Sequence, residues 1–108
     1  MPPFFSPWKP PADIFYSDTQ WLIKIELAGI SPDEVVILAQ GSSLTVKGRR
    51  RDLMLRQGFS CHSMEITYSS FERSFALPAR IVADSIHWDY QQGILLISFS
   101  TEDQGGQL

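Results

Sequence analysis

The segment Trp21-Leu22-Ile23-Lys24-Ile25-Glu26-Leu27 decides the fold class of this chain. Its odd-numbered positions are all apolar, whereas Lys24 and Glu26 between them are charged. A period of two residues is typical of a β-strand with one buried face, because successive side chains of a strand point to opposite sides. The segment therefore predicts a strand that lies on a hydrophobic core.

The same pattern of short strands extends over most of the sequence. Further strands are expected at residues 13–16, 35–39, 44–47, 71–77, 86–90 and 94–99. Turns are expected between several of them, at residues 31–34, 41–43 and 91–93. No window of helical length has a 3.6-residue period, so the pattern predicts one all-β sandwich domain.

Two of these strands, at residues 35–39 and 94–99, are apolar on both faces. A strand that reads as a continuous apolar run is usually covered on both sides, as in the interior of a layered protein. We therefore expect that something covers both sides of the strand at residues 35–39, and residues 94–99 show the same apolar pattern.

Composition and charge limit the classes of function. The 108 residues have the length of one domain, and the net charge of −3 gives no reason to expect nucleic acid as a partner. Cys61 is the only cysteine, which fits a reducing compartment. The chain starts without the features of a signal peptide and has no apolar run near the ~20 residues of a membrane helix. We expect a cytoplasmic protein that has no membrane partner.

The two ends of the chain differ from the strand pattern. Residues 1–11 contain five prolines together with Phe4, Phe5 and Trp8. Proline at this density predicts an extended arm, whose rings are expected to pack on the domain or on another chain. Residues 101–108 are expected to form a short tail, so the domain itself is expected to span residues 12–100.

Residues 49–70 form an unusually long segment without a clear core face. Loops of this length in a compact domain are uncommon and usually functional. The segment is too apolar for a solvated linker, since it contains Leu53, Met54, Leu55, Phe59 and Met64. We interpret it as an arm that docks on a partner.

The residue patterns that enzymes need do not occur in this sequence. There is no Gly-x-Ser-x-Gly run for a nucleophile, and the turn glycines stand singly, so no glycine-rich phosphate loop is formed. Cys61-His62 with His87 supplies too few ligands for a structural zinc site, which needs four. We predict no catalytic residue, no cofactor and no metal, and conclude that the chain is not an enzyme.

Two sets of arginines have competing interpretations. Arg49-Arg50-Arg51 reads as a solvated loop end in preference to a phosphate site. Arg73 shares a strand face with Phe71 and Phe75, so its guanidinium lies among apolar groups. It is interpreted either as a side chain that reaches solvent past the strand edge or as one half of an ion pair across a subunit interface.

Five segments together resemble the small heat-shock protein family of bacterial type, which is built on the alpha-crystallin domain. The five segments are Trp8-Lys9-Pro10-Pro11-Ala12-Asp13-Ile14, Glu26-Leu27-Ala28-Gly29-Ile30, Leu44-Thr45-Val46-Lys47-Gly48-Arg49-Arg50, Phe71-Glu72-Arg73-Ser74-Phe75-Ala76-Leu77-Pro78 and Gly93-Ile94-Leu95. The fourth is similar to the family's Phe-x-Arg-x-Phe-x-Leu-Pro strand. The resemblance covers residues 8 to 100.

The resemblance implies an immunoglobulin-like β-sandwich that forms a homodimer through a long strand-exchange loop. The part of the loop that pairs with the partner maps onto residues 56–64, and Arg73 falls on the family's interface arginine. The implied dimer-interface residues are Arg56, Gln57, Gly58, Phe59, Ser60, Cys61, His62, Ser63, Met64 and Arg73. The implied activity is a stress-response chaperone that holds unfolding client proteins without ATP.

The family also implies a groove that receives an Ile-x-Ile tail from a neighbouring subunit. By position, its lining residues are Val35, Ile37, Ala39, Ile86 and Trp88. Trp88 stands where the family has alanine, so the groove is interpreted either as narrowed by the indole or as open with the indole on its rim. The sequence after Phe99 has no Ile-x-Ile motif, so we expect a dimer with weak holding activity instead of a large shell.

One alternative function uses the same type of sandwich. Co-chaperones with a CS domain are adaptors for an ATP-driven chaperone and are typically monomeric. They lack the exchange loop and the strand motif at residues 71–78, so residues 49–78 favour the first interpretation over this one.

Overall fold

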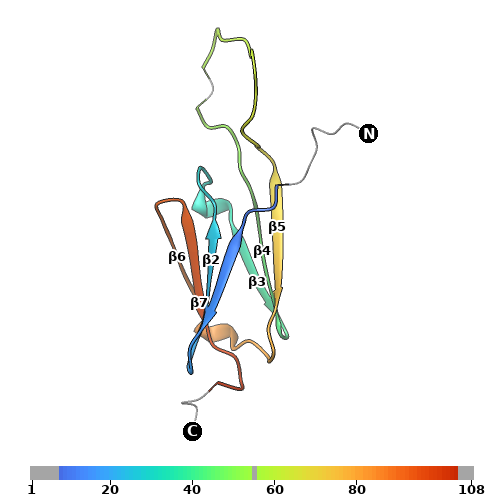
Figure 1. Cartoon of the computed structure of the whole chain (residues 1–108), viewed down its shortest axis with the longest axis vertical. Helices are drawn as coiled ribbons and strands as arrows, with labels where there is room; N and C mark the ends of the chain where they lie inside the picture. The colour runs from blue at the N-terminus through green and yellow to red at the C-terminus, as the bar shows by residue number, and fades with distance from the viewer. Residues whose placement is uncertain (1–7, 55, 105–108) are drawn as a thin grey trace, which may run out of the picture.

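The protein is a two-layer sandwich of antiparallel sheets, and the computed structural model describes residues 8–54 and 56–104 (Figure 1). The first sheet has the order β1-β2-β7-β6 and the second the order β3-β4-β5. The strands are β1 (Ala12–Tyr16), β2 (Trp21–Glu26), β3 (Val36–Gln40), β4 (Ser43–Arg49), β5 (Ser70–Ala76), β6 (His87–Gln91) and β7 (Ile94–Phe99). Each strand expected from the sequence is present, and the all-β sandwich is confirmed.

Two short 3₁₀ helices link strands of different sheets. The first, η2 (Pro32–Glu34), connects β2 to β3 where a turn was expected, with Pro32 as its first residue. Proline suits the first turn of a helix because its missing N–H would be unpaired there in any case. The second, η3 (Ala83–Ser85), connects β5 to β6.

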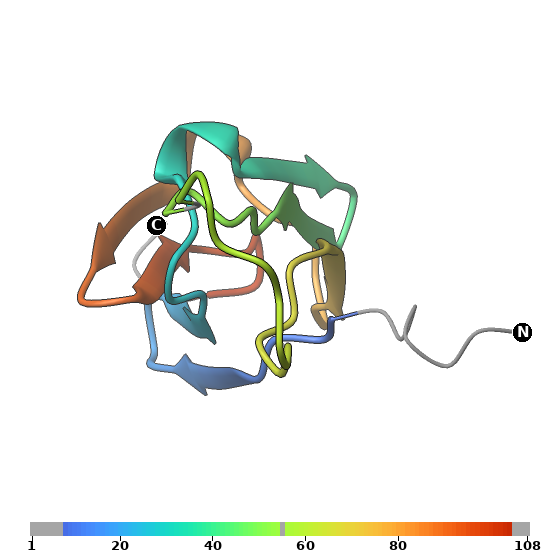
Figure 2. The ribbon, with the colours of Figure 1, turned by 90° about the horizontal axis from the view of Figure 1, so that it is seen from above.

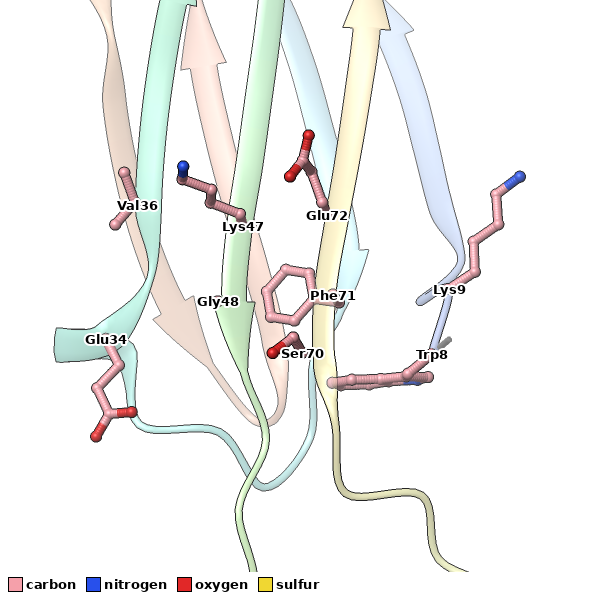
Figure 3. A pocket seen from close by; sticks show the side chains of 9 residues that line it. All are labelled: Trp8, Lys9, Glu34, Val36, Lys47, Gly48, Ser70, Phe71 and Glu72. Carbon is pink, nitrogen blue, oxygen red and sulfur yellow. The ribbon is translucent and has the colours of Figure 1, made fainter. Parts of the chain in front are cut away.

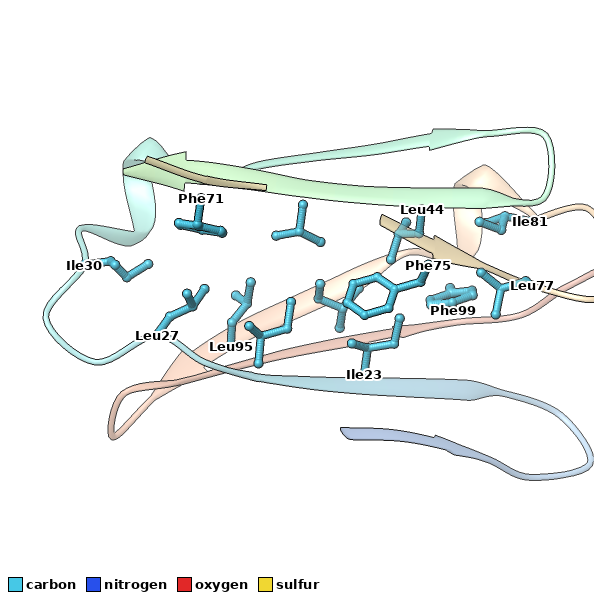
Figure 4. Packing of buried hydrophobic residues seen from close by; sticks show 13 residues of the cluster. Ile23, Leu27, Ile30, Leu44, Phe71, Phe75, Leu77, Ile81, Leu95 and Phe99 are labelled. Carbon is cyan, nitrogen blue, oxygen red and sulfur yellow. The ribbon is translucent and has the colours of Figure 1, made fainter. Parts of the chain in front are cut away.

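The core lies between the facing sheets, as the end-on view shows (Figure 2). Strand register explains which side chains reach it: Ile25 lies opposite Leu95 across β2 and β7, and Leu44 lies opposite Phe75 across β4 and β5. These residues belong to a single cluster of buried side chains to which strands of both sheets contribute (Figure 4). The alternation at residues 21–27 was predicted to mark a strand with one buried face, and Ile23, Ile25 and Leu27 are indeed fully buried.

The outer face of β3 exposes apolar side chains. Val36 and Leu38 point away from the core, and their exposed fractions are 42% and 48%. The described residues of this chain do not cover this face fully, so the cover expected from the sequence stays a prediction. On β7 the outward residues Ile94 and Leu96 are half-buried, because β7 is a central strand whose two neighbours flank them.

Candidate binding surfaces

The edge strand β1 exposes apolar side chains on both of its faces. Ile14 lies opposite the core residue Ile23, and Phe15 lies opposite Leu22 on the outer face. The exposed fractions of Ile14, Phe15 and Tyr16 are 46%, 49% and 75%. An outermost strand carries unpaired backbone N–H and C=O groups, so it is able to pair with a further strand. β1 therefore offers both hydrogen-bonding groups and apolar contacts along one edge.

The long loop projects away from the sandwich at the end where β1 begins (Figure 1). Large apolar side chains are exposed along its described part: Leu53, Met54, Phe59, Met64 and Ile66. Residues 56–64, which the sequence assigned to a dimer interface, are all exposed, and Gly58 there has a φ of +86°. Leu55 lies outside the described residues. Since free-standing apolar loops are unfavourable in water, this arrangement fits an arm that needs a partner.

Arg50 at the base of the loop is half-buried and makes several contacts within the chain, unlike the solvated loop end expected for residues 49–51. Its Nε donates a hydrogen bond to the Thr67 carbonyl oxygen at 2.8 Å, and its Nη1 donates to the Ala28 carbonyl oxygen at 3.3 Å. Its guanidinium lies 3.8 Å from the centre of the Trp8 ring. The neighbouring Arg51 forms an ion pair with Glu34 of η2. The sequence signal for Arg50 was its place in residues 44–50, one of the five segments that resemble the small heat-shock protein family.

The arm expected at residues 1–11 meets the sandwich through Trp8. The indole contacts the Phe71 ring edge-on, with the ring centres 5.4 Å apart. This confirms for Trp8 that the aromatic residues of the arm pack on the domain, whereas Phe4 and Phe5 lie outside the described residues. Pro10 is fully buried, so the last part of the arm forms part of the folded domain.

Arg73 is half-buried beside β1. Its Nη1 donates to the Pro10 carbonyl oxygen at 2.5 Å, and its guanidinium lies 5.1 Å from the Phe75 ring centre. A backbone carbonyl, and not a carboxylate, therefore satisfies part of this side chain within the chain. The contact fixes the segment that leads directly into β1.

The five predicted groove residues come from the edge strands of the two sheets or directly precede them. Ile37 and Ala39 lie opposite the core residues Val46 and Leu44, and Trp88 lies opposite the core residue Ile97. All three therefore point to the core side of an edge strand. Val35 and Ile86 are half-buried against the core, whereas Trp88 is 48% exposed.

A cleft of about 600 Å³ lies at the loop end of the three-stranded sheet (Figure 3). Its walls are built by the arm, by η2 and by all three strands of that sheet, and include Trp8, Lys9, Glu34, Val36, Lys47, Phe71 and Glu72. Lys47 and Glu72 are opposite each other across β4 and β5. The cleft thus places aromatic and aliphatic surface beside charges of both signs, and sequence reasoning did not identify it.

Groups for chemistry are sparse in the described part of the chain. Cys61 is exposed and has a free thiol. Among residues 8–54 and 56–104, no group of three or more His, Cys, Asp or Glu side chains has the arrangement to hold a metal ion. Within the same residues, no helix has the length and apolar character to cross a membrane.

A model of the Hsp20/alpha crystallin family matches residues 13–107. The chain belongs to this family. It is 33% identical over 96 residues to small heat shock protein C2 of Rickettsia felis, a match that covers 89% of this chain and 62% of that protein. It spans about half to three fifths of the length of the first curated relatives that it matches.

Solved structures of small heat shock proteins have the same fold. A small heat-shock protein from Xylella fastidiosa superposes with a TM-score of 0.77 at 28% identity, covering 95% of this chain and 94% of that one. Heat shock protein 16.0 from Schizosaccharomyces pombe superposes with a TM-score of 0.81 at 20% identity, covering 94% of both chains. The resemblance found in the sequence, and the alpha-crystallin type of sandwich that it implied, are therefore confirmed.

Proposed function

We propose that this member of the Hsp20/alpha crystallin family binds unfolding proteins without ATP and so prevents their aggregation. The observation that carries the proposal is the set of large apolar side chains left exposed on β1, on β3 and along the loop. Unfolding proteins expose similar side chains and aggregate through them. A folded protein with exposed apolar edges competes for that surface, and its backbone edges add hydrogen bonds to the captured segment.

The chain forms a homodimer in this proposal, by exchange of residues 56–64 between two copies. The exposed edge of β1 is the acceptor that fits best, because it has free backbone groups and apolar side chains on both faces. Arg73 supports the acceptor through its hydrogen bond to Pro10, two residues before Ala12 at the start of β1. Exchange would bury Phe59 and Met64, whose exposed fractions are 78% and 72%.

The second binding surface consists of Val35, Ile37, Ala39, Ile86 and Trp88. It takes the apolar tail of another subunit or a client segment. The support for it is that residues of both edge strands point to the core side without being fully buried. Trp88 narrows this surface, because an indole replaces a methyl group at a position that faces inward.

The holding activity is tested by light scattering of a heat-aggregating client protein without ATP. A several-fold molar excess of the chain is expected to suppress the scattering, and addition of ATP is expected to change nothing. A matched amount of an unrelated β-sandwich protein controls for crowding. If the excess leaves aggregation unchanged, the chain as given has no holding function. If suppression requires ATP together with a second chaperone, the chain is an adaptor.

A further inference from the structure

Arg50 contacts three segments that are far apart in the sequence. Its guanidinium stacks on Trp8 of the lead-in to β1, and its hydrogen bonds reach Ala28 after β2 and Thr67 on the returning limb of the loop. Its own backbone N–H donates to the Ser69 carbonyl oxygen at 3.0 Å, which joins the two limbs of the loop at their base. One side chain thus links both limbs of the loop to the turn after β2 and to the lead-in.

These contacts use properties that only an arginine has. The planar guanidinium donates in two directions within its plane and presents its face to an aromatic ring at the same time. Here the two acceptors are backbone carbonyl oxygens, and the ring is that of Trp8. A lysine at this position would keep the charge but not this combination of stacking and divergent hydrogen bonds.

The neighbouring arginines have different surroundings. Arg49 is exposed, and it lies on the outer face of β4 opposite Ser70. Arg51 is exposed and forms its ion pair with Glu34, a type of surface pair that contributes little stability. Only Arg50 of the three reaches the lead-in to β1.

We propose that Arg50 is a positioning residue for subunit exchange. It fixes the direction of the loop relative to the segment that leads into β1. In the proposed dimer, the loop is donated to the partner and β1 accepts the partner's loop. Trp8 connects the loop to this lead-in, because its ring contacts both Arg50 and Phe71. Two residues later, the Pro10 carbonyl oxygen accepts a hydrogen bond from Arg73. One guanidinium therefore prearranges the donor and the acceptor of the exchange within each subunit. The inference rests on the proposed exchange dimer.

When the loop and the lead-in are already ordered in the free subunit, less conformational entropy is lost as the dimer forms, and the dimer is more stable. Loss of the guanidinium is therefore expected to weaken the dimer more than it weakens the folded subunit. Arg50→Met keeps most of the aliphatic length of the side chain and removes the stacking and both hydrogen bonds. Arg50→Lys restores the charge alone, so it is expected to rescue the dimer only in part.

The test measures the dimer dissociation constant of the full chain by sedimentation equilibrium. Arg50→Met is expected to raise this constant about tenfold, and Arg49→Met is expected to leave it unchanged. Trp8→Leu is expected to raise it by a similar factor, and the double variant Trp8→Leu/Arg50→Met to raise it no further, because both changes break the same connection. The unfolding midpoint of each variant in urea, measured at a concentration where it is monomeric, separates loss of positioning from loss of stability.

Three results would overturn the inference. An unchanged dissociation constant for Arg50→Met in a wild-type chain that does dimerise would refute the role of Arg50 and leave the exchange dimer intact. If the dissociation constant of the double variant rises by the product of the two single-variant factors, the connection between Trp8 and Arg50 is refuted. A wild-type chain that remains monomeric at every concentration would refute the exchange dimer itself, and the role of Arg50 with it.

Discussion

Gly48 lies close to a core side chain of the neighbouring strand. It lies opposite Phe71 across β4 and β5, and a Cβ at this position would lie 3.0 Å from Cε2 and 3.1 Å from Cζ of that ring. Phe71 is only 4% exposed, and its ring also contacts Trp8. A side chain at position 48 would therefore require the Phe71 ring to shift by a few tenths of an ångström, and glycine avoids this contact.

Gly48→Ala is expected to destabilise the fold by about 1–3 kcal/mol, because the added methyl group would press on the Phe71 ring. Urea unfolding should show a lower midpoint with an unchanged slope. The control is Lys47→Ala, an exposed change on the same strand that should stay within about 0.5 kcal/mol. An unchanged midpoint for Gly48→Ala would mean that Phe71 yields easily, contrary to this packing argument.

Thr101 is a buried polar residue, with 3% of its surface exposed. Its Oγ1 accepts a hydrogen bond from Trp21 Nε1 at 3.3 Å and donates one to Asp103 Oδ1 at 2.5 Å. The following turn is held to the β1–β2 connection, since Gln104 Nε2 donates to the Ser17 carbonyl oxygen at 3.2 Å. This one hydroxyl thus joins the end of the domain to β2.

Thr101→Val is expected to cost about 1–3 kcal/mol, because it leaves the Trp21 N–H without its acceptor in a partly buried site. The measurement is the free energy of unfolding in urea. Thr67→Val makes the same chemical change at an exposed position and should have a small effect. Equal stability of the Thr101→Val variant and the wild type would show that water replaces the hydroxyl.

At the scale of elements, the loop and β1 form a pair of unsatisfied surfaces. The loop exposes apolar side chains, and β1 exposes a strand edge. The loop projects from the end of the sandwich at which β1 begins (Figure 1). In a two-fold dimer, each copy supplies both surfaces, so two exchanges satisfy all four of them. In the proposed dimer, a single chain would therefore carry both features.

Phe59→Asp is expected to raise the dimer dissociation constant at least about tenfold, because it places a charge where exchange would bury an aromatic ring. Sedimentation equilibrium measures the constant. Ser42→Asp adds the same charge in the turn between β3 and β4, away from the loop, and should have little effect. A Phe59→Asp variant that dimerises as well as the wild type would show that residues 56–64 are not the exchanged segment.

Trp88 on the edge strand β6 leads to a prediction for the second binding surface. Trp88→Ala is expected to strengthen binding of an Ile-x-Ile peptide about tenfold, because removal of the indole leaves apolar space for the peptide. Fluorescence anisotropy of a labelled peptide measures the affinity. His87→Ala, on the other face of the same strand, serves as the control. Weaker binding after Trp88→Ala would show that the indole contacts the peptide instead of blocking it.

For the whole molecule, the proposed dimer would contribute to the stability of the fold. Partner contacts that exist only in the folded state stabilise it in proportion to concentration. The thermal midpoint is therefore expected to rise by about 3–5 °C for each tenfold increase in protein concentration, because a domain of this size gains several degrees for each kcal/mol. Differential scanning calorimetry measures it. The Phe59→Asp variant should show a smaller dependence, and a flat dependence for the wild type would contradict dimerisation.

The sequence by itself determined the sandwich, because the alternation at residues 21–27 depends only on which side chains avoid water. It also determined the position of the long loop and the family, since residues 71–78 carry both the strand pattern and the family motif. The candidate interface residues and groove residues could be named only through this resemblance. The structure places the candidate groove residues on edge strands or directly before them, and the candidate interface segment in the exposed loop.

Only the tertiary structure decided which arginine acts at the loop base and which apolar residues remain exposed. Arg49, Arg50 and Arg51 are chemically identical, and the difference between them arises from segments up to about forty residues away that fold around one of them. The sequence predicts cover for Val36 and Leu38 because they are hydrophobic, but it does not indicate whether another layer of the protein lies over their face of the sheet. Packing between distant segments determines both the role of Arg50 and the exposure of Val36 and Leu38, and the local sequence pattern does not predict such packing.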